Sequence, residues 1–190
     1  MNKDFLTKGL EGLSSATPKA TVLLKELFVR MVFKKGMLLS ISDQAFPTLY
    51  FMEPGLVRSY FYYHQEEYTC CLTEEGFLLP SRSFYRGEPV VEYIHFRQDG
   101  VGWLLNLTQA EALAQREPVI YSMLLEIYDR DRQEGKHREM MLRLKHAEDR
   151  FLYHMKFGRG LARKFINRFS GSFLNMKERY FSSIKKKYAE

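Results

Sequence analysis

The segment FSGSFLNMKERYFSSIKKK, residues 169–187, is the most informative part of this sequence. It predicts two short helices joined by a tight turn at Asn175, because asparagine tolerates the left-handed backbone conformation that such turns use. Gly171 is small enough to let the second helix cross close to the first. The apolar residues that are spaced to face one shared core are Leu174, Met176, Phe181 and Ile184. This spacing is typical of a helix-turn-helix, whose second helix enters the DNA major groove.

The polar residues of the second helix are left on its outer face. They are Lys177, Glu178, Arg179, Ser182 and Ser183, and the basic run Lys185, Lys186 and Lys187 follows them. On a recognition helix, side chains of these types contact base edges and phosphates. An ordinary helical hairpin with a solvated basic face has the same pattern, so the pattern by itself leaves both interpretations open.

The distribution of charge favours DNA. Residues 130–190 hold 17 Lys and Arg against 7 Asp and Glu, a net charge of +10, whereas residues 1–129 hold 12 against 16, a net charge of −4. Such an asymmetry indicates one half that binds a polyanion and one half that does not. A basic helix on a membrane surface would need a continuous apolar face, which the turn at Asn175 interrupts.

Length and composition indicate a globular protein. The chain has 190 residues, of which 45% are hydrophobic, enough for one generous domain or for a medium domain with a small one. No apolar run is long enough to span a bilayer, and residues 1–5 do not begin a signal peptide because they include an acid and no long apolar region follows. We expect a cytoplasmic protein that does not bind membranes.

Side chains suited to catalysis or metal binding are few. Cys70 and Cys71 are adjacent, and neighbours on a strand point to opposite faces, so we expect two ordinary strand residues rather than a disulfide. Cupin-type metal enzymes need a close His-x-His pair with a carboxylate and a further histidine. The histidines are scattered instead, at positions 64, 95, 137, 146 and 154. We therefore expect no catalytic residues, no metal and no cofactor.

The remaining elements change from strands to helices along the chain. The expected elements are a helix running into a strand over residues 18–33, short strands broken by turns from Lys34 to Trp103 with a polar loop at residues 64–67, a helix 108–115 capped by Thr108, a long helix 118–145 and a helix 148–157. Many short strands at regular spacing favour a closed antiparallel barrel or jelly roll. The fold class is therefore α+β.

The long helix connects two parts of different character. Ile120, Leu124 and Ile127, and further on Met141 and Leu144, form two stretches of an apolar stripe with a highly charged middle. Two interpretations are open: the stripe is a dimer seam, which we favour, or it packs on the barrel of its own chain. The domains we expect are a barrel over residues 1–117, a dimerisation helix over 118–145 and a helix-turn-helix module over 146–190.

In this order the elements resemble the Crp/Fnr family of bacterial transcription regulators, the cyclic-AMP receptor protein group. Residues 49–58, LYFMEPGLVR, look like the strand–turn–strand motif of the family, and residues 170–185 match its helix-turn-helix framework. Residues 76–79, GFLL, resemble the strand that enters its phosphate-binding cassette. The resemblance covers nearly the whole chain. It implies a double-stranded β-helix or jelly-roll barrel that senses an effector, a long dimerisation helix and a module that binds double-stranded DNA.

The nucleotide cassette departs from the family pattern. The family's Gly-Glu pair, which holds the ribose, falls here on Pro80 and Ser81, and its Arg-Ser pair, which neutralises the cyclic phosphate, falls on about Val91 and Glu92. A carboxylate near a phosphate site repels the ligand. We therefore expect that the chain does not bind cyclic AMP in the usual way. The residues of the corresponding effector pocket are Pro80, Ser81, Arg82, Arg86, Val91 and Glu92; the two arginines either coordinate another anion or are exposed loop residues.

The recognition helix departs as well. The family positions that read guanine and cytosine fall on Glu178, Arg179 and Ser183, so the charges of the first two are swapped and the last is missing. We expect Lys177, Arg179 and Ser182 to contact bases or phosphates, and Lys185, Lys186 and Lys187 to contact phosphates only. The expected function is a dimeric DNA-binding regulator with a small-molecule effector yet to be identified. The alternative is a sensor of the same fold that has lost specific DNA binding and acts through protein partners.

Overall fold

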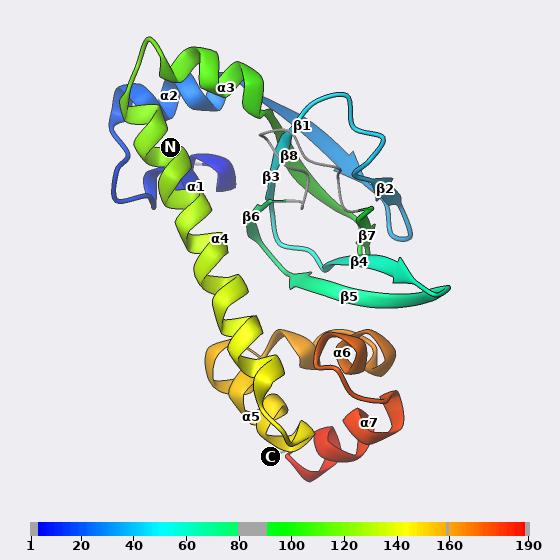
Figure 1. The fold of residues 1–190 in the computed structure, drawn as a ribbon. Coiled ribbons are helices and arrows are strands. Elements are labelled where there is room, and N and C mark those ends of the chain that lie inside the picture. Colours follow the sequence, from blue (N-terminus) through cyan, green and yellow to red (C-terminus); the bar gives the residue numbers. More distant parts are fainter. Residues whose placement is uncertain (1–3, 80–90, 159, 189–190) are drawn as a thin grey trace.

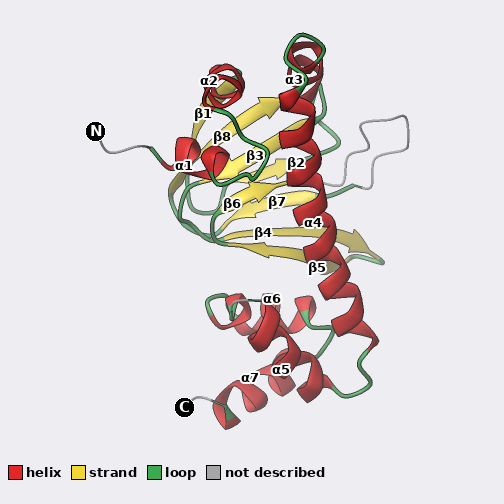
Figure 2. Cartoon of the chain, turned by 90° about the vertical axis from the view of Figure 1, so that its left-hand side faces the viewer, coloured by secondary structure: helices red, strands yellow, loops and turns green. Residues whose placement is uncertain are grey.

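The structure is a computed structural model, and it describes residues 4–79, 91–158 and 160–188. Within these residues the chain is an α+β protein in which a β-sandwich with N-terminal helices is joined by a long helix, α4 (Val119–Arg143), to a C-terminal helical module (Figure 1). Figure 2 shows that α4 runs along the sandwich and continues past it to the C-terminal helices. The predicted fold class is confirmed. None of the described helices combines the length and the apolar character that a membrane span requires.

The sandwich consists of two antiparallel sheets of four described strands each. The strands are β1 (Phe28–Phe33), β2 (Leu38–Ser40), β3 (Thr48–Met52), β4 (Val57–Tyr63), β5 (Glu66–Thr73), β6 (Gly76–Leu78), β7 (Tyr93–Phe96) and β8 (Gly100–Asn106). One sheet has the order β1-β8-β3-β6 and the other the order β2-β7-β4-β5. Apart from the β4–β5 hairpin, neighbouring strands are distant in sequence, which is the topology of a jelly roll.

Each face of the first sheet has its own apolar core. Inside the sandwich, Phe33 and Phe96 from opposite sheets stack with their ring centroids 4.1 Å apart. On the outside, α1 (Phe5–Glu11) and α2 (Pro18–Glu26) cover the sheet with fully buried leucines such as Leu6 and Leu24. The carboxylate of Asp4 caps α1, and the hydroxyl of Thr17 caps α2. These caps accept hydrogen bonds from N–H groups that the helices leave without internal partners.

The hairpin of β4 and β5 is tighter than the sequence predicts. Its turn consists of His64 and Gln65 instead of the four residues 64–67, because β5 already begins at Glu66. Both turn residues have positive φ, 47° and 67°. Two successive left-handed residues match the right-handed twist of the flanking strands, as in a type I′ turn.

A β-bulge interrupts the same hairpin. Ser59 pairs with Cys71 and Tyr60 with Thr69, so Cys70 is an extra residue without a partner on β4. The bulge interrupts the regular alternation of side chains, and both Cys70 and Cys71 line the same cavity. Both are free thiols.

The cap of α3 (Leu107–Ala114) lies before the predicted residue. The side-chain oxygen of Asn106 accepts hydrogen bonds from the N–H groups of Thr108 and Gln109, at 2.9 and 3.4 Å. Thr108 is therefore inside the helix, and its assignment as the cap is wrong. The cap is Asn106, two residues before Thr108, because its side-chain oxygen reaches two N–H groups that have no partner within the helix.

The apolar stripe of α4 is buried within its own chain. Ile120, Leu124 and Ile127 join the core that α1, α2 and α3 form on the sheet. Next to them, a carboxylate oxygen of Glu126 accepts the backbone N–H of Ser14 at 2.9 Å, and the other that of Ser15 at 3.0 Å. The interpretation of this stripe as a dimer seam is therefore wrong, and the alternative of packing on its own chain is correct. Met141 lies in a separate, C-terminal core.

The C-terminal module contains α5 (Ala147–Phe157), the short 3₁₀ helix η1 (Leu161–Arg163), α6 (Asn167–Phe173) and α7 (Glu178–Lys187). The predicted turn at Asn175 is present, with φ at 51°. A Cβ atom on Gly171 would lie 2.9 Å from the carbonyl oxygen of Met176, which shows how closely the turn and α6 approach each other. Phe181 and Ile184 of α7 are buried in the core of this module. The helix-turn-helix geometry thus follows the sequence pattern.

Candidate DNA-binding surface and effector cavity

The outer face of α7 presents polar side chains at helical spacing. The residues on this face, opposite the buried Phe181 and Ile184, are Arg179, Ser182, Ser183 and Lys186. Arg179, Ser183 and Lys186 are exposed, and Ser182 is half-buried. Lys177 and Glu178 are exposed at the N-terminal end of the helix, where recognition helices contact bases. The residues predicted to read DNA therefore share one accessible surface.

The three terminal lysines differ in whether their ammonium groups already have partners within the protein. The ammonium group of Lys185 donates to the carbonyl oxygen of Arg163 at 3.1 Å, and that of Lys187 lies 2.6 Å from a carboxylate oxygen of Glu148. Lys186 is exposed and has neither an ion pair nor a side-chain hydrogen bond within the part of the chain that the structure describes. Of the three, Lys186 is the one already available to a phosphate.

Arg150, which sequence reasoning missed, fixes the position of the turn. Its guanidinium donates to the carbonyl oxygens of Leu174 at 2.8 Å and Asn175 at 2.9 Å, both in the turn, and to Leu144 at 2.8 Å, at the end of α4. Charge-assisted bonds of this kind are the stronger ones. Because one side chain joins the end of α4 to the turn, the direction of α4 determines where α7 lies.

The module also packs directly on the sandwich. The hydroxyl of Ser172 on α6 accepts the backbone N–H of Thr69 on β5 at 2.9 Å. Nearby, the guanidinium carbon of the fully buried Arg58 lies 4.0 Å from the ring centroid of Phe169, and Arg58 pairs with Glu67 at 2.7 Å. The Arg58 that ends the family-like motif of residues 49–58 thus lies at the contact between the two parts of the molecule.

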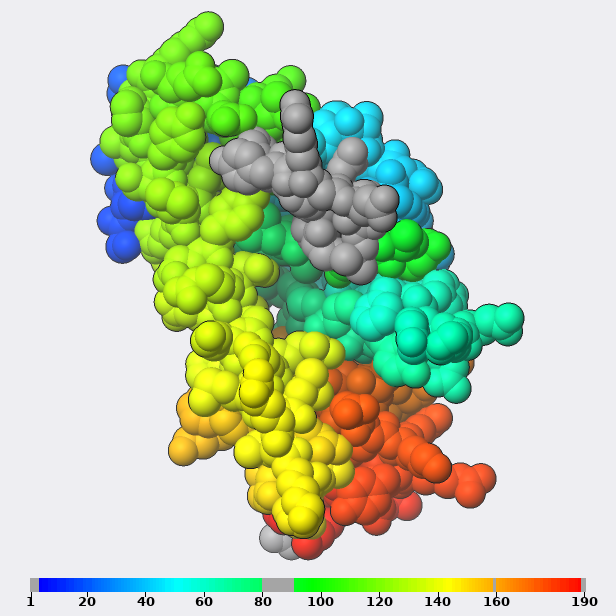
Figure 3. Space-filling model, viewed as in Figure 1, coloured from blue at the N-terminus to red at the C-terminus, as the bar shows by residue number. Residues whose placement is uncertain are grey.

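A large cavity lies between the sandwich and α4. Its volume is about 1050 Å³, and its walls come from β5 and β6, from α4, and from α5 and α6 of the C-terminal module. Figure 3 shows the surface hollowed between α4 and the strands. Ligand sites in proteins are typically concave and of about 300–1,000 Å³, so the cavity is of the size that an organic molecule requires.

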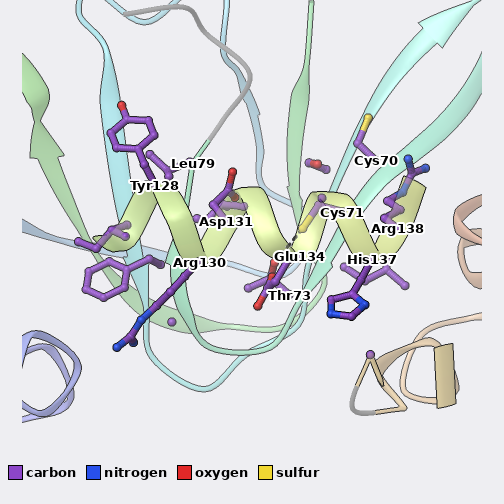
Figure 4. A pocket seen from close by; sticks show the side chains of 18 of the residues that line it. Cys70, Cys71, Thr73, Leu79, Tyr128, Arg130, Asp131, Glu134, His137 and Arg138 are labelled. Atoms are coloured by element: carbon purple, nitrogen blue, oxygen red, sulfur yellow. Dashed lines mark hydrogen bonds between the residues drawn. The ribbon is translucent and has the colours of Figure 1, made fainter. Parts of the chain in front are cut away.

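Acidic side chains and thiols face each other across this cavity. Asp131 and Glu134 project from α4, and Cys70 and Cys71 from β5 (Figure 4). Although Asp131 is exposed to solvent on one side, partial desolvation of its carboxyl, with Glu134 and Glu92 as further causes, raises the pKa of Asp131 to about 6. Burial also raises the pKa of the Cys70 thiol to about 11 and that of Cys71 to about 12. Both thiols are therefore protonated at neutral pH and are poor nucleophiles.

The predicted effector residues are placed only in part. Pro80, Ser81, Arg82 and Arg86 lie outside the described residues. Val91 is exposed, whereas Glu92 is buried and lines the cavity. Among the residues that the structure describes, no cluster of His, Cys, Asp and Glu is able to hold a metal ion.

Sequence reasoning missed most of the cavity. Asp131 and Glu134 are one helical turn apart on α4, so their shared face was readable. The sequence did not show that this face lies opposite β5, because periodicity identifies a polar face of a helix but not the element that packs across from it.

Comparison with known proteins identifies the fold. No protein-family model matches the chain, and no curated protein matches it by sequence. Solved structures do match: FixK2 from Bradyrhizobium japonicum has a TM-score of 0.70 at 14% identity, over 85% of this chain and 84% of that one. A transcriptional regulator of the Crp/Fnr family from Eubacterium rectale has a TM-score of 0.67 at 12% identity, over 92% and 84%. The catabolite activator protein of Thermus thermophilus has a TM-score of 0.55 at 18% identity, over 95% and 86%.

These matches establish a Crp/Fnr-like fold over most of the chain: a cyclic-nucleotide-binding-like sandwich, a long helix and a helical C-terminal region. The resemblance inferred from the sequence motifs is confirmed at the level of the fold.

Proposed function

We propose that the protein is a dimeric transcription regulator that binds double-stranded DNA through α7 and responds to a small-molecule effector in its cavity. The observation that carries this proposal is the outer face of α7, on which Arg179, Ser183 and Lys186 are exposed side by side at helical spacing. The surrounding segment, residues 130–190, has a net charge of +10, so phosphates are attracted to the half of the chain that bears this face.

The roles of the side chains follow from their positions on α7. Arg179 lies in the first turn of the helix and is suited to a base edge, where arginine forms paired hydrogen bonds with guanine. Lys177 and Ser182 flank it and contact bases or backbone. Lys186, in the last turn, contacts phosphate, and Lys185 and Lys187 reach phosphates only by leaving their bonds to Arg163 and Glu148.

A second face of α4 supports dimerisation. Tyr121, Leu125 and Tyr128 follow one another at intervals of four and three residues and are exposed by 40, 67 and 40%. This is the interval of a coiled-coil seam. Because Ile120, Leu124 and Ile127 are used within the chain, we assign the dimer contact to Tyr121, Leu125 and Tyr128 instead. These three residues also line the cavity, so a second copy on this face would cover part of the cavity opening. The sensor is then residues 1–117, the connecting helix 118–145 and the DNA module 146–190.

The cavity offers a physical link between sensing and DNA binding. His154 on α5 and Phe173 on α6 line it together with Cys71 of the sandwich, so a bound molecule touches both parts at once. A ligand that fits one arrangement of these parts better than another shifts the population toward it. The buried Glu92 in the wall disfavours a cyclic phosphate, so the effector is not cyclic AMP bound in the usual way.

Selection from a random-sequence duplex library at several salt concentrations tests this function. We expect enrichment of a two-fold symmetric site with half-sites about one turn of duplex apart, and affinity that falls with salt. Salt-sensitive binding without an enriched sequence, with and without cellular extract as a source of effector, would contradict regulation through specific DNA sites. It would favour the alternative, a sensor that acts through protein partners.

Two variants, tested on the enriched DNA site, distinguish a residue that recognises a base from a residue that contacts phosphate. Arg179→Ala should cost about 1–3 kcal/mol and relax sequence preference at one base pair, because it removes hydrogen bonds to a base edge. Lys186→Ala should weaken binding to all sequences about equally and lower the salt slope by about one unit. Affinities are measured by titrating labelled duplexes. Equal effects of the two variants on sequence preference would contradict these roles.

A further inference from the structure

The cavity contains polar groups that have no partner in the protein. The hydroxyl oxygen of Ser59 is buried, lines the cavity and forms no hydrogen bond; the residue is only 2% exposed. A buried hydroxyl without a partner costs about 1–3 kcal/mol, so it is a place where a ligand atom or a water gains a hydrogen bond. Asp131 and Glu134 also have no ion pair or hydrogen bond among the residues described.

The electrostatics of the wall disfavour an anion. Asp131 and Glu134 on α4 face the cavity together with Glu92, which precedes β7. Two cations also line the cavity. The guanidinium of Arg130 pairs with Glu126, and that of Arg138 donates to the carbonyl oxygen of Thr69 at 2.9 Å while its buried Nε has no partner among the described residues. Burial lowers the pKa of His154 in the wall to about 4, so this histidine is uncharged at neutral pH. The Nδ1 atom of His137 is hydrogen-bonded to the hydroxyl of Tyr153 at 2.9 Å. A cation placed between Asp131 and Glu134 would relieve the repulsion between like charges one helical turn apart.

Much of the remaining lining is apolar, although Glu74, Glu75 and Glu111 also contribute to it. The apolar residues include Leu79, Leu124, Ile127, Met141 and Phe173. A lone metal ion does not fit this description, because none of the described acidic, cysteine and histidine side chains form a set of three metal ligands. A space of about 1050 Å³ with apolar walls instead matches an organic molecule.

We propose that this cavity binds an organic cation with an apolar body, such as a hydrophobic amine or a quaternary onium ion, with its charge between Asp131 and Glu134 and its body against the apolar wall. The claim that this cation is the effector rests on the proposed function. The claim that the cavity binds the cation does not depend on that function. The inference runs against the overall charge of the molecule, which is +6 and would favour an organic anion if binding were non-specific.

The test uses two probes of the same size and shape but opposite charge, tetraphenylphosphonium and tetraphenylborate. Equilibrium dialysis of the full chain should show saturable binding of the phosphonium, with the borate at least about tenfold weaker. Asp131→Asn and Glu134→Gln should each weaken phosphonium binding by about tenfold, since each removes one carboxylate without changing its shape. The matched control is Asp129→Asn on the same helix, because Asp129 pairs with Arg132 outside the cavity.

The cysteines locate the bound probe. Cys70 and Cys71 line the cavity, so bound phosphonium should slow their alkylation by iodoacetamide at alkaline pH, where a fraction of each buried thiol is ionised; mass spectrometry follows the reaction. The proposal is overturned if the phosphonium does not bind, if the borate binds equally well or better, if neither carboxylate variant changes affinity, or if alkylation is not slowed. The measurement contains no DNA, so a chain that binds the cation but selects no duplex would uphold this inference and contradict the proposed function.

Discussion

Two glycines show how surroundings decide the effect of one methyl group. A Cβ on Gly171 would lie 2.9 Å from the backbone oxygen of Met176 and 3.4 Å from the backbone of Glu178, and backbone atoms cannot move aside cheaply. We expect Gly171→Ala to lower the free energy of unfolding by about 1–3 kcal/mol. Gly135 in the middle of α4 has open space around it, so Gly135→Ala should raise stability by about 0.5–1 kcal/mol.

Urea denaturation of both glycine variants measures these values. The pair is a matched test, because both sites are helical and receive the same methyl group. Similar effects at the two sites would contradict the close approach of α6 and the turn.

His154 should make the protein sensitive to mild acid. Its ring nitrogen Nε2 accepts the backbone N–H of Ala162 at 3.1 Å, and burial lowers its pKa from 6.5 to about 4. As the pH falls below 6.5, the unfolded chain binds a proton that the folded chain excludes, so stability falls until the pH reaches about 4. The loss attributable to this residue is about 3 kcal/mol.

His154→Gln keeps an acceptor for Ala162 but does not titrate. Its stability, measured by urea denaturation between pH 4 and pH 7, should therefore depend less on pH than that of the wild type. Parallel stability curves for the two proteins would show that His154 is not the group responsible.

At the scale of the element, α4 has two apolar faces with different partners. Ile120, Leu124 and Ile127 are buried on the N-terminal helices, whereas Leu125 is 67% exposed. If a second copy covers the exposed face, Leu125→Glu places a charge in a helix–helix contact. We expect the dimer dissociation constant to rise by about 100-fold or more.

Sedimentation velocity measures this constant. The control is Val22→Glu on α2, because Val22 is 56% exposed and lies away from the seam. A stable dimer in the Leu125 variant, or equal dissociation of the control, would place the interface elsewhere.

At the scale of the whole molecule, the DNA module and the sandwich are expected to unfold together. Ser172 bonds to the backbone N–H of Thr69, a residue only 1% exposed. Ser172→Ala leaves this buried N–H without its acceptor, and we expect a loss of about 1–3 kcal/mol. Ser183→Ala, in the same motif but exposed, should stay within about 0.5 kcal/mol of the wild type.

Calorimetry measures both serine variants, and hydrogen exchange of the Thr69 amide should become faster only in Ser172→Ala. Unchanged exchange at Thr69 would show that the contact between α6 and β5 does not stabilise the molecule.

Local patterns were sufficient for most elements, though not for α1, and for the geometry of the helix-turn-helix. The turn at Asn175, the close approach at Gly171 and the outer face of α7 all depend on residues within one short segment, so their spacing along the chain already specifies their geometry. The same holds for the strand-rich half, whose short strands and turns indicated a jelly roll.

Contacts between distant segments needed the folded chain. Cys70 and Cys71 face one cavity because the register of β4 against β5 shifts by one residue, and register is a property of two strands together. The apolar stripe of α4 was visible in the sequence. The element that packs on this stripe was not visible, because an apolar face indicates that it is covered but does not identify the covering element.

The amino-acid order alone thus determined most of the helices and strands, where the chain turns into α7, and which half of the molecule carries the excess positive charge. Tertiary structure alone decided the cavity, because its walls come from β5, α4 and α5, which are separated along the chain. The physical reason is that helical period, turn preference and net charge act between near neighbours or on average, whereas burial, desolvation and unpaired polar atoms depend on which distant surfaces meet.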